Sequence, residues 1–308
     1  MIVILIPFFL VAQIPVEENA WKFGPEYTFQ LTANLTANSE NYIRLSSNTT
    51  ALLRCRPKNS EALSCHLQIP ETCKSSYDKA SEINTTNVIK CIPLNFNYFE
   101  IKFNKSGIDN LIVEKNISNW NLNIIKAFIN QLNIGANLNE KQNQSNFDDK
   151  ENSTIGECKV NFKINHIPRE QNIRKDNPFI LDVLPLPDKV SKGNIEIEKI
   201  RNLKECTNFV NYLWANFGDE KENTTEVGLN TQLDSVTARM NITDTSFSSC
   251  THTEATKSFE SDNKKFKITE KIILTLKTIE AAKDKLPVIP NPGTTPIFIK
   301  MNVQELKV

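Results

Sequence analysis

The chain has 308 residues, and its 36 Lys and Arg residues balance 36 Asp and Glu residues, so the formal net charge is zero. A chain without excess cations is a poor candidate for a nucleic-acid-binding protein, because it displaces few counterions from phosphates. The length allows one large domain or two ordinary ones, and 39% hydrophobic residues indicate a folded chain. Only eight glycines are present, which counts against Gly-rich phosphate-binding loops.

The first twelve residues, MIVILIPFFLVA, are apolar and uncharged. This run is too short to span a bilayer, which needs about 20 residues, and no later stretch approaches that length. It matches the hydrophobic region of a secretory signal peptide. We therefore expect a signal peptide over residues 1–12, with its end between residues 12 and 20, and a secreted, extracellular protein without a transmembrane segment. The alternative is a buried N-terminal strand.

Alternating apolar and polar residues predict the first half-buried strands, at residues 27–35 and 99–103. The same alternation returns at residues 158–164, 236–242 and 272–276. Thr, Ile, Val and Phe are frequent in these runs, as a pleated sheet favours. Because polar loops separate the strands and no regular β-α-β order is present, the pattern indicates an antiparallel sheet or barrel.

Between these strands, residues 120–134 have the period of an amphipathic helix. Ser118 or Asn119 is the expected N-cap, and Gly135 the expected stop. The wide apolar face should pack against a sheet or inside a barrel, with a membrane-surface helix as the less favoured alternative. The apolar face consists of Leu122, Ile124, Ile125, Phe128, Ile129 and Leu132. The opposite face carries Asn123, Lys126, Asn130 and Asn133.

Three polar or proline-rich stretches are predicted to be connections. Residues 137–152 are charged and should form a solvated loop. Pro178, Pro185 and Pro187 mark a second connection, and LPVIPNPGTTP, from Leu286 to Pro296, marks a third. Too few residues follow the third connection to form another domain.

Seven cysteines in a chain of this length indicate disulfides and an oxidising compartment, and their odd number leaves one over. Asn-x-Ser/Thr sequons provide weak support, because chance alone gives roughly five. The candidate glycosylation sites are Asn34, Asn48, Asn84, Asn104, Asn116, Asn143, Asn152, Asn223 and Asn241.

Signatures of enzyme chemistry are absent from the sequence. It has no GxSxG, HExxH, GxGxxG or P-loop motif, and no Cys or His residues at metal-ligand spacing. The three histidines, His66, His166 and His252, are better explained as surface or hydrogen-bonded residues. We expect no catalytic residue, no cofactor and no metal site, although loss of an assayed activity on replacing His166 or His252 would reopen the enzyme class.

Four motifs in order resemble the vitellogenin N-terminal domain of the large lipid transfer protein family. They are WKFGPEYTF at residues 21–29, the helix from Ser118 to Leu132, GECKVNF at residues 156–162, and IRNLKEC at residues 200–206. The chain is identified as a divergent, insect-like member. The resemblance implies one domain over residues 21–308, a mainly β fold in which a large antiparallel β-barrel is wrapped around one central amphipathic helix.

The resemblance also implies a disulfide between Cys158 and Cys206. Such a bond closes a loop of about 48 residues and would stabilise the fold by about 4 kcal/mol in the chain-entropy model. The other cysteines of the first half would then pair locally, with Cys250 left over. The expected local pairs are Cys55 with Cys65 and Cys73 with Cys91.

The family's activity is lipid transport by yolk-precursor storage lipoproteins, which are taken up through an endocytic lipoprotein receptor. In the family, the lipid cavity is built mainly by domains that follow the barrel. The resemblance therefore implies that this chain is mainly the receptor-binding barrel, with lipid as a partner through the full-length architecture. The alternative is a stand-alone secreted glycoprotein that serves as a binding module without lipid cargo.

Overall fold

The computed structural model describes residues 1–17, 20–39, 43–78, 87–141, 144–167, 178–184, 194–213, 231–258 and 265–299. At residues 39, 43–45, 69–78 and 87–95 only the backbone is described. The fold is mainly β, as expected, and the described residues contain one short α-helix.

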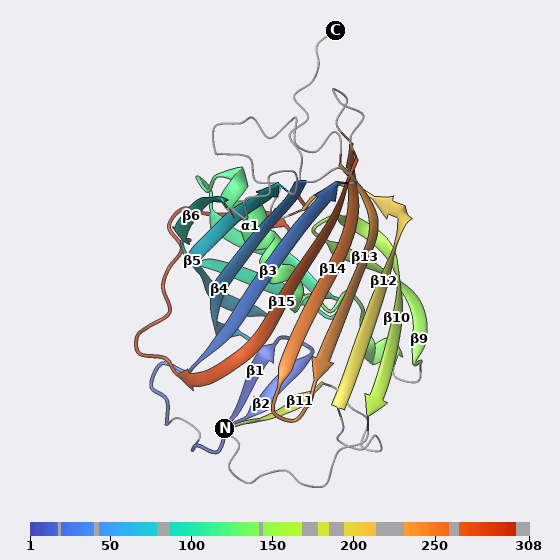
Figure 1. Ribbon diagram of the computed structural model, residues 1–308. Helices are drawn as coiled ribbons and strands as arrows, with labels where there is room; N and C mark the ends of the chain where they lie inside the picture. Colours follow the sequence, from blue (N-terminus) through green and yellow to red (C-terminus); the bar gives the residue numbers. More distant parts are fainter. Residues whose placement is uncertain are drawn as a thin grey trace.

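Thirteen strands form one large antiparallel sheet, in the order β16-β8-β7-β5-β4-β3-β15-β14-β13-β12-β10-β9, with β6 paired to β5. In Figure 1 the long strands β4, β3, β15, β14, β13 and β12 lie side by side across the front. The strands are β3 (Pro25–Ser39), β4 (Ile43–Asn59), β5 (Ala62–Asp78), β6 (Asn87–Asn95), β7 (Phe99–Asn104), β8 (Gly107–Glu114), β9 (Asn146–Ser153), β10 (Gly156–Ile167), β12 (Asn194–Thr207), β13 (Thr231–Ile242), β14 (Phe247–Ser258), β15 (Lys265–Ala281) and β16 (Pro292–Pro296).

All five predicted strands are confirmed, and they lie within β3, β7, β10, β13 and β15. Their apolar positions point inward as alternation requires: Tyr27, Phe29 and Leu31 of β3 are fully buried. The two edge strands, β16 and β9, do not pair with each other among the described residues. The sheet is therefore open at this point, and its closure into a barrel stays a prediction.

The N-terminal residues form a separate three-stranded sheet of β1 (Ile2–Ile6), β2 (Leu10–Gln13) and β11 (Ile180–Val183), in the order β1-β2-β11. Leu5, Ile6 and Leu10 are fully buried and belong to the main apolar core. The Tyr27 hydroxyl of β3 donates a 2.6 Å hydrogen bond to the carbonyl of Ile4. The structure thus has the buried N-terminal strands that were the alternative to a signal peptide.

Helix α1 (Asn119–Ile129) lies on the inner side of the curved sheet (Figure 1). The Ser118 side chain caps it by accepting a 3.1 Å hydrogen bond from the backbone N–H of Asn121. A short 3-10 turn, η1 (Asn130–Leu132), continues the helix, and Gly135 follows with a positive φ of 86°. The expected cap is therefore confirmed, whereas the helical segment ends at Leu132, three residues before the expected stop at Gly135.

The polar face of the helix is buried as well as the apolar one. Lys126, Asn130 and Asn133 are buried like the apolar face, and only Asn123 is partly exposed. Lys126 donates a 2.9 Å hydrogen bond from Nζ to the carbonyl of Phe298. The helix is enclosed because the inner side of the sheet offers polar partners as well as apolar ones.

All three predicted connections contain strands, and β11 lies in the second one, between Pro178 and Pro185. Residues 137–152 were expected to form a loop, but they include the 3-10 turn η2 (Leu138–Lys141) and most of β9. Strand β9 lacks the usual alternation of apolar and polar residues, because two of its inward side chains, Glu151 and Ser153, are polar, and only Phe147 is apolar. The third proline-rich stretch ends in β16, an edge strand whose prolines, Pro292 and Pro296, lie at its two ends.

The burial of α1 can be tested with a cavity-forming substitution. Ile125→Ala should lower the free energy of unfolding by about 2–5 kcal/mol, because Ile125 is fully buried and its loss leaves a cavity. Urea unfolding followed by circular dichroism measures the loss. The matched control Val288→Ala removes a side chain that is 88% exposed and should change the value by less than about 0.5 kcal/mol. Equal effects would contradict an enclosed helix.

Candidate functional site

A layer of buried polar side chains crosses the interior of the large sheet. Along β14, Thr251 and Thr253 lie between Phe247 of the main apolar core and Ala255 of a second apolar cluster. Along β15, Glu270 separates the same two clusters. We call this set the polar layer. Its members are Asn130, Gln131, Asn133, Glu151, Lys199, Arg201, Thr251, Thr253 and Glu270.

Glu151 is the centre of the polar layer. Its Oε1 lies 2.7 Å from Lys199 Nζ, and its Oε2 lies 2.8 Å from Arg201 Nη2. The three side chains are at most 1% exposed. Because Glu151 belongs to β9 while Lys199 and Arg201 belong to β12, the ion pairs join two strands that are both hydrogen-bonded to β10.

Lys199 also fixes the chain that leaves the helix. Its Nζ donates hydrogen bonds to the carbonyls of Asn133, at 2.8 Å, and Ile134, at 3.2 Å. Burial lowers the pKa of Lys199, and Arg201 acts in the same direction, whereas the carboxylate of Glu151 opposes the shift. Gly135 lies so close that a Cβ atom there would be 2.6 Å from the Glu151 carboxylate. Only glycine fits this position without displacing the ion pair.

Two further amides dock the helix on the layer. Gln131 Nε2 donates a 2.9 Å hydrogen bond to Thr251 Oγ1 of β14. Asn133 Nδ2 donates to Glu151 Oε1 at 3.2 Å, and Asn133 Oδ1 accepts a 2.8 Å bond from the backbone N–H of Ile108. These two amides are therefore matched to the backbone of β8 and to side chains of β9 and β14.

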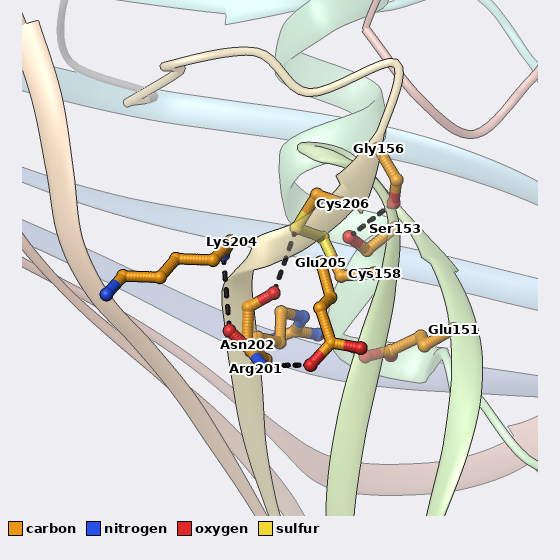
Figure 2. Close-up of a disulfide and its surroundings, with 9 residues drawn as sticks. All are labelled: Glu151, Ser153, Gly156, Cys158, Arg201, Asn202, Lys204, Glu205 and Cys206. Atoms are coloured by element: carbon orange, nitrogen blue, oxygen red, sulfur yellow. Dashed lines mark hydrogen bonds and ion pairs between the residues drawn. A yellow bond between two sulfur atoms is a disulfide. The ribbon is translucent and has the colours of Figure 1, made fainter.

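Above this layer, the Cys158–Cys206 disulfide joins β10 to β12, and it is the pair implied by the resemblance. Figure 2 shows the bond together with Glu151 and Arg201 on the neighbouring strands. The Cys206 sulfur also lies 3.4 Å from the carbonyl of Asn202, and Ser153 donates a 3.1 Å bond to the carbonyl of Gly156 in the adjoining turn (Figure 2).

The second disulfide links Cys55 of β4 to Cys65 of β5, again as expected. Cys73 and Cys91 are opposite each other in the β5–β6 register, but their side chains lie outside those described. Cys250 is a free, half-buried thiol on β14. Burial raises the pKa of this thiol, while Lys271 and Arg239 act in the opposite direction.

Six of the nine predicted glycosylation sites fall on described residues, and all six asparagines are exposed. Asn34 and Asn48 are direct cross-strand neighbours on β3 and β4. The other four are Asn104, Asn116, Asn152 and Asn241. Asn84, Asn143 and Asn223 lie outside the described residues.

Two small cavities are lined by described residues. One of about 30 Å³ lies in the polar layer, and one of about 10 Å³ lies beside the β1–β2 hairpin. His66 stacks on Tyr98, and His252 lies 3.8 Å from Glu254, so these histidines are not gathered at one site. Within the described ranges, no three His, Cys, Asp or Glu side chains form a metal-binding group.

Sequence reasoning missed the polar layer, although a signal was present. Lys199, Arg201 and Glu270 interrupt otherwise apolar inward positions of alternating strands. Charged residues in phase with a buried face indicate paired internal charges, because an unpaired charge is rarely buried.

These features define a disulfide-bonded antiparallel β domain that encloses a helix on an internal polar layer. Residues 21–284 match the family model described as the vitellogenin N-terminal domain, so the chain belongs to this family. Vitellogenin-A1 of Aedes aegypti is 26% identical over 237 residues, which are 69% of this chain and 11% of that protein.

A solved structure titled for lipid–protein interactions in lipovitellin shares the fold. It has a TM-score of 0.57 at 13% sequence identity, over 92% of this chain and 28% of that one. The chain therefore spans a small part of both relatives. Among the described residues, no helix is long and apolar enough to cross a membrane.

The charge balance around Glu151 can be tested with an isosteric change. Glu151→Gln should lower the free energy of unfolding by about 3–5 kcal/mol, because it leaves Lys199 and Arg201 buried without their counter-charge. Urea titration measures the loss. The control Glu157→Gln breaks an exposed 3.4 Å pair with Lys150 and should cost less than about 1 kcal/mol. A loss at Glu151 no larger than the control would contradict the central role of this carboxylate.

The disulfide that closes the longer loop should contribute more to the free energy of unfolding than the one that closes the shorter loop. Cys158 and Cys206 are 48 residues apart, and Cys55 and Cys65 are 10 apart. The C158S/C206S variant should lose about 4 kcal/mol and the C55S/C65S variant about 3 kcal/mol in the chain-entropy model. Guanidinium unfolding of both variants beside the parent chain measures this order. A larger loss for the short loop would exclude the entropic explanation.

Proposed function

We propose that this chain is the N-terminal domain of a secreted, non-enzymatic lipid-transport protein of the yolk-precursor type, in which it binds an endocytic lipoprotein receptor. The family match over residues 21–284 carries the proposal. The lipovitellin-like fold over 92% of the chain supports it. These observations favour this function over a stand-alone binding module.

The lipid itself is assigned to the rest of the protein. The cavities of about 30 and 10 Å³ are far smaller than the roughly 300–1,000 Å³ of pockets that hold small-molecule ligands. The helix and the apolar side chains around it fill the inner side of the sheet. The domain is therefore proposed to contribute recognition and not storage volume.

Secretion is supported by two disulfides and by six exposed sequon asparagines. Glycosylation at the nine sequons belongs to the same proposal. Cleavage after Ala12 would remove β1 and nearly all of β2, uncovering core residues that they contact. N-terminal sequencing of the secreted chain distinguishes a removed signal peptide from a retained hairpin.

The function is tested on the full chain secreted from insect cells. Organic extraction followed by phosphate analysis should give much less than one phospholipid per chain. Biolayer interferometry should show saturable binding to the ectodomain of the endocytic lipoprotein receptor of the same species, with the same chain unfolded and alkylated as the control. Stoichiometric phospholipid would contradict the assignment of lipid to other domains. Equal signals from folded and unfolded chains would contradict receptor binding.

A further inference from the structure

The cavity in the polar layer has the properties of an internal ligand site. It lies between the helix and strands β12 to β15 and has a volume of about 30 Å³. A buried water needs about 10–15 Å³, so the cavity has room for about two. Its walls carry Asn130, Arg201, Thr253 and Glu270.

Two of these walls present polar atoms that are not hydrogen-bonded to any described residue. Arg201 is 1% exposed at its side chain, and only its Nη2 reaches Glu151, so that Nε and Nη1 have no acceptor among the described residues. Asn130 is 7% exposed, and its Oδ1 has no donor within the same part of the chain. Buried polar atoms of this kind are normally satisfied by protein groups or ordered water.

The charges around the cavity select the kind of ligand. Arg201 and Glu270 on its walls have opposite charges, and behind Arg201 the Glu151 carboxylate pairs with both Lys199 and Arg201. A small anion would meet the Glu270 carboxylate, and a cation would meet the Arg201 guanidinium. A neutral molecule that both donates and accepts hydrogen bonds fits both walls.

We propose that this cavity is a binding site for about two ordered water molecules, which accept from Arg201 and donate to Asn130 Oδ1. The waters join Asn130 of the 3-10 turn after the helix to Arg201 of strand β12. They thereby complete the polar layer without a further charged group. This inference is independent of the lipid-transport and receptor-binding proposals.

A crystal structure of the full chain at about 1.5 Å resolution tests the site directly. The expected result is water density within hydrogen-bonding distance of Arg201 Nε or Nη1. Crystals soaked in bromide should show no anomalous peak there. A bromide peak, a bound organic ligand, a protein side chain in the cavity or no density at all would overturn the proposal.

A pair of buried substitutions gives an independent readout in solution. Asn130→Leu removes the proposed water acceptor and should lower the folding equilibrium constant by about fivefold or more. Thr49→Val is the matched control, because Thr49 is 1% exposed and its Oγ1 also lacks a partner among the described residues, but it lies outside the cavity lining. The control should leave the constant unchanged or raise it. A rise for Asn130→Leu as well would show that Oδ1 binds no water.

Discussion

Two buried cations share one buried carboxylate, and much of the interior is arranged around these two ion pairs. Glu151 reaches the core from β9, Lys199 and Arg201 from β12, and both strands flank β10. An unpaired charge at this depth would be very costly, so each partner restricts where the others can lie. Lys199 extends the constraint to the carbonyls after the helix, which ties the helix end to the sheet.

The polar layer also explains why the interior has two apolar clusters and not one. The main core surrounds the helix and the N-terminal hairpin, while the second lies around Cys158 and Leu213. Polar groups between them need specific partners at specific distances, unlike apolar side chains, which tolerate many packings. The layer thus sets the position of the helix along the strands, and the Cys158–Cys206 bond fixes the strands beyond it.

Local patterns in the sequence predicted the parts of the fold that depend on local rules. Alternation located five strands, and Ser118 marked the start of the helix. The same rules failed where a polar side chain has a distant partner. The buried partners of Lys126 and Asn133, which are Phe298 and Glu151, could not be found by these rules, because they are far away in sequence or in an unrecognised strand. Strand β9 was missed for the same reason, since its inward Glu151 breaks the apolar period.

The pairing of β3 with β15 has a consequence for how the chain is made. Leu31 lies opposite Leu274, so the second neighbour of β3 leaves the ribosome only when most of the domain has been synthesised. Strand β3 can pair early with β4, and the Cys55–Cys65 bond can close that local unit in the nascent chain. Its other edge stays unpaired for the whole interval and is open to aggregation. A sheet completed so late by distant segments should fold slowly and depend on chaperones during synthesis.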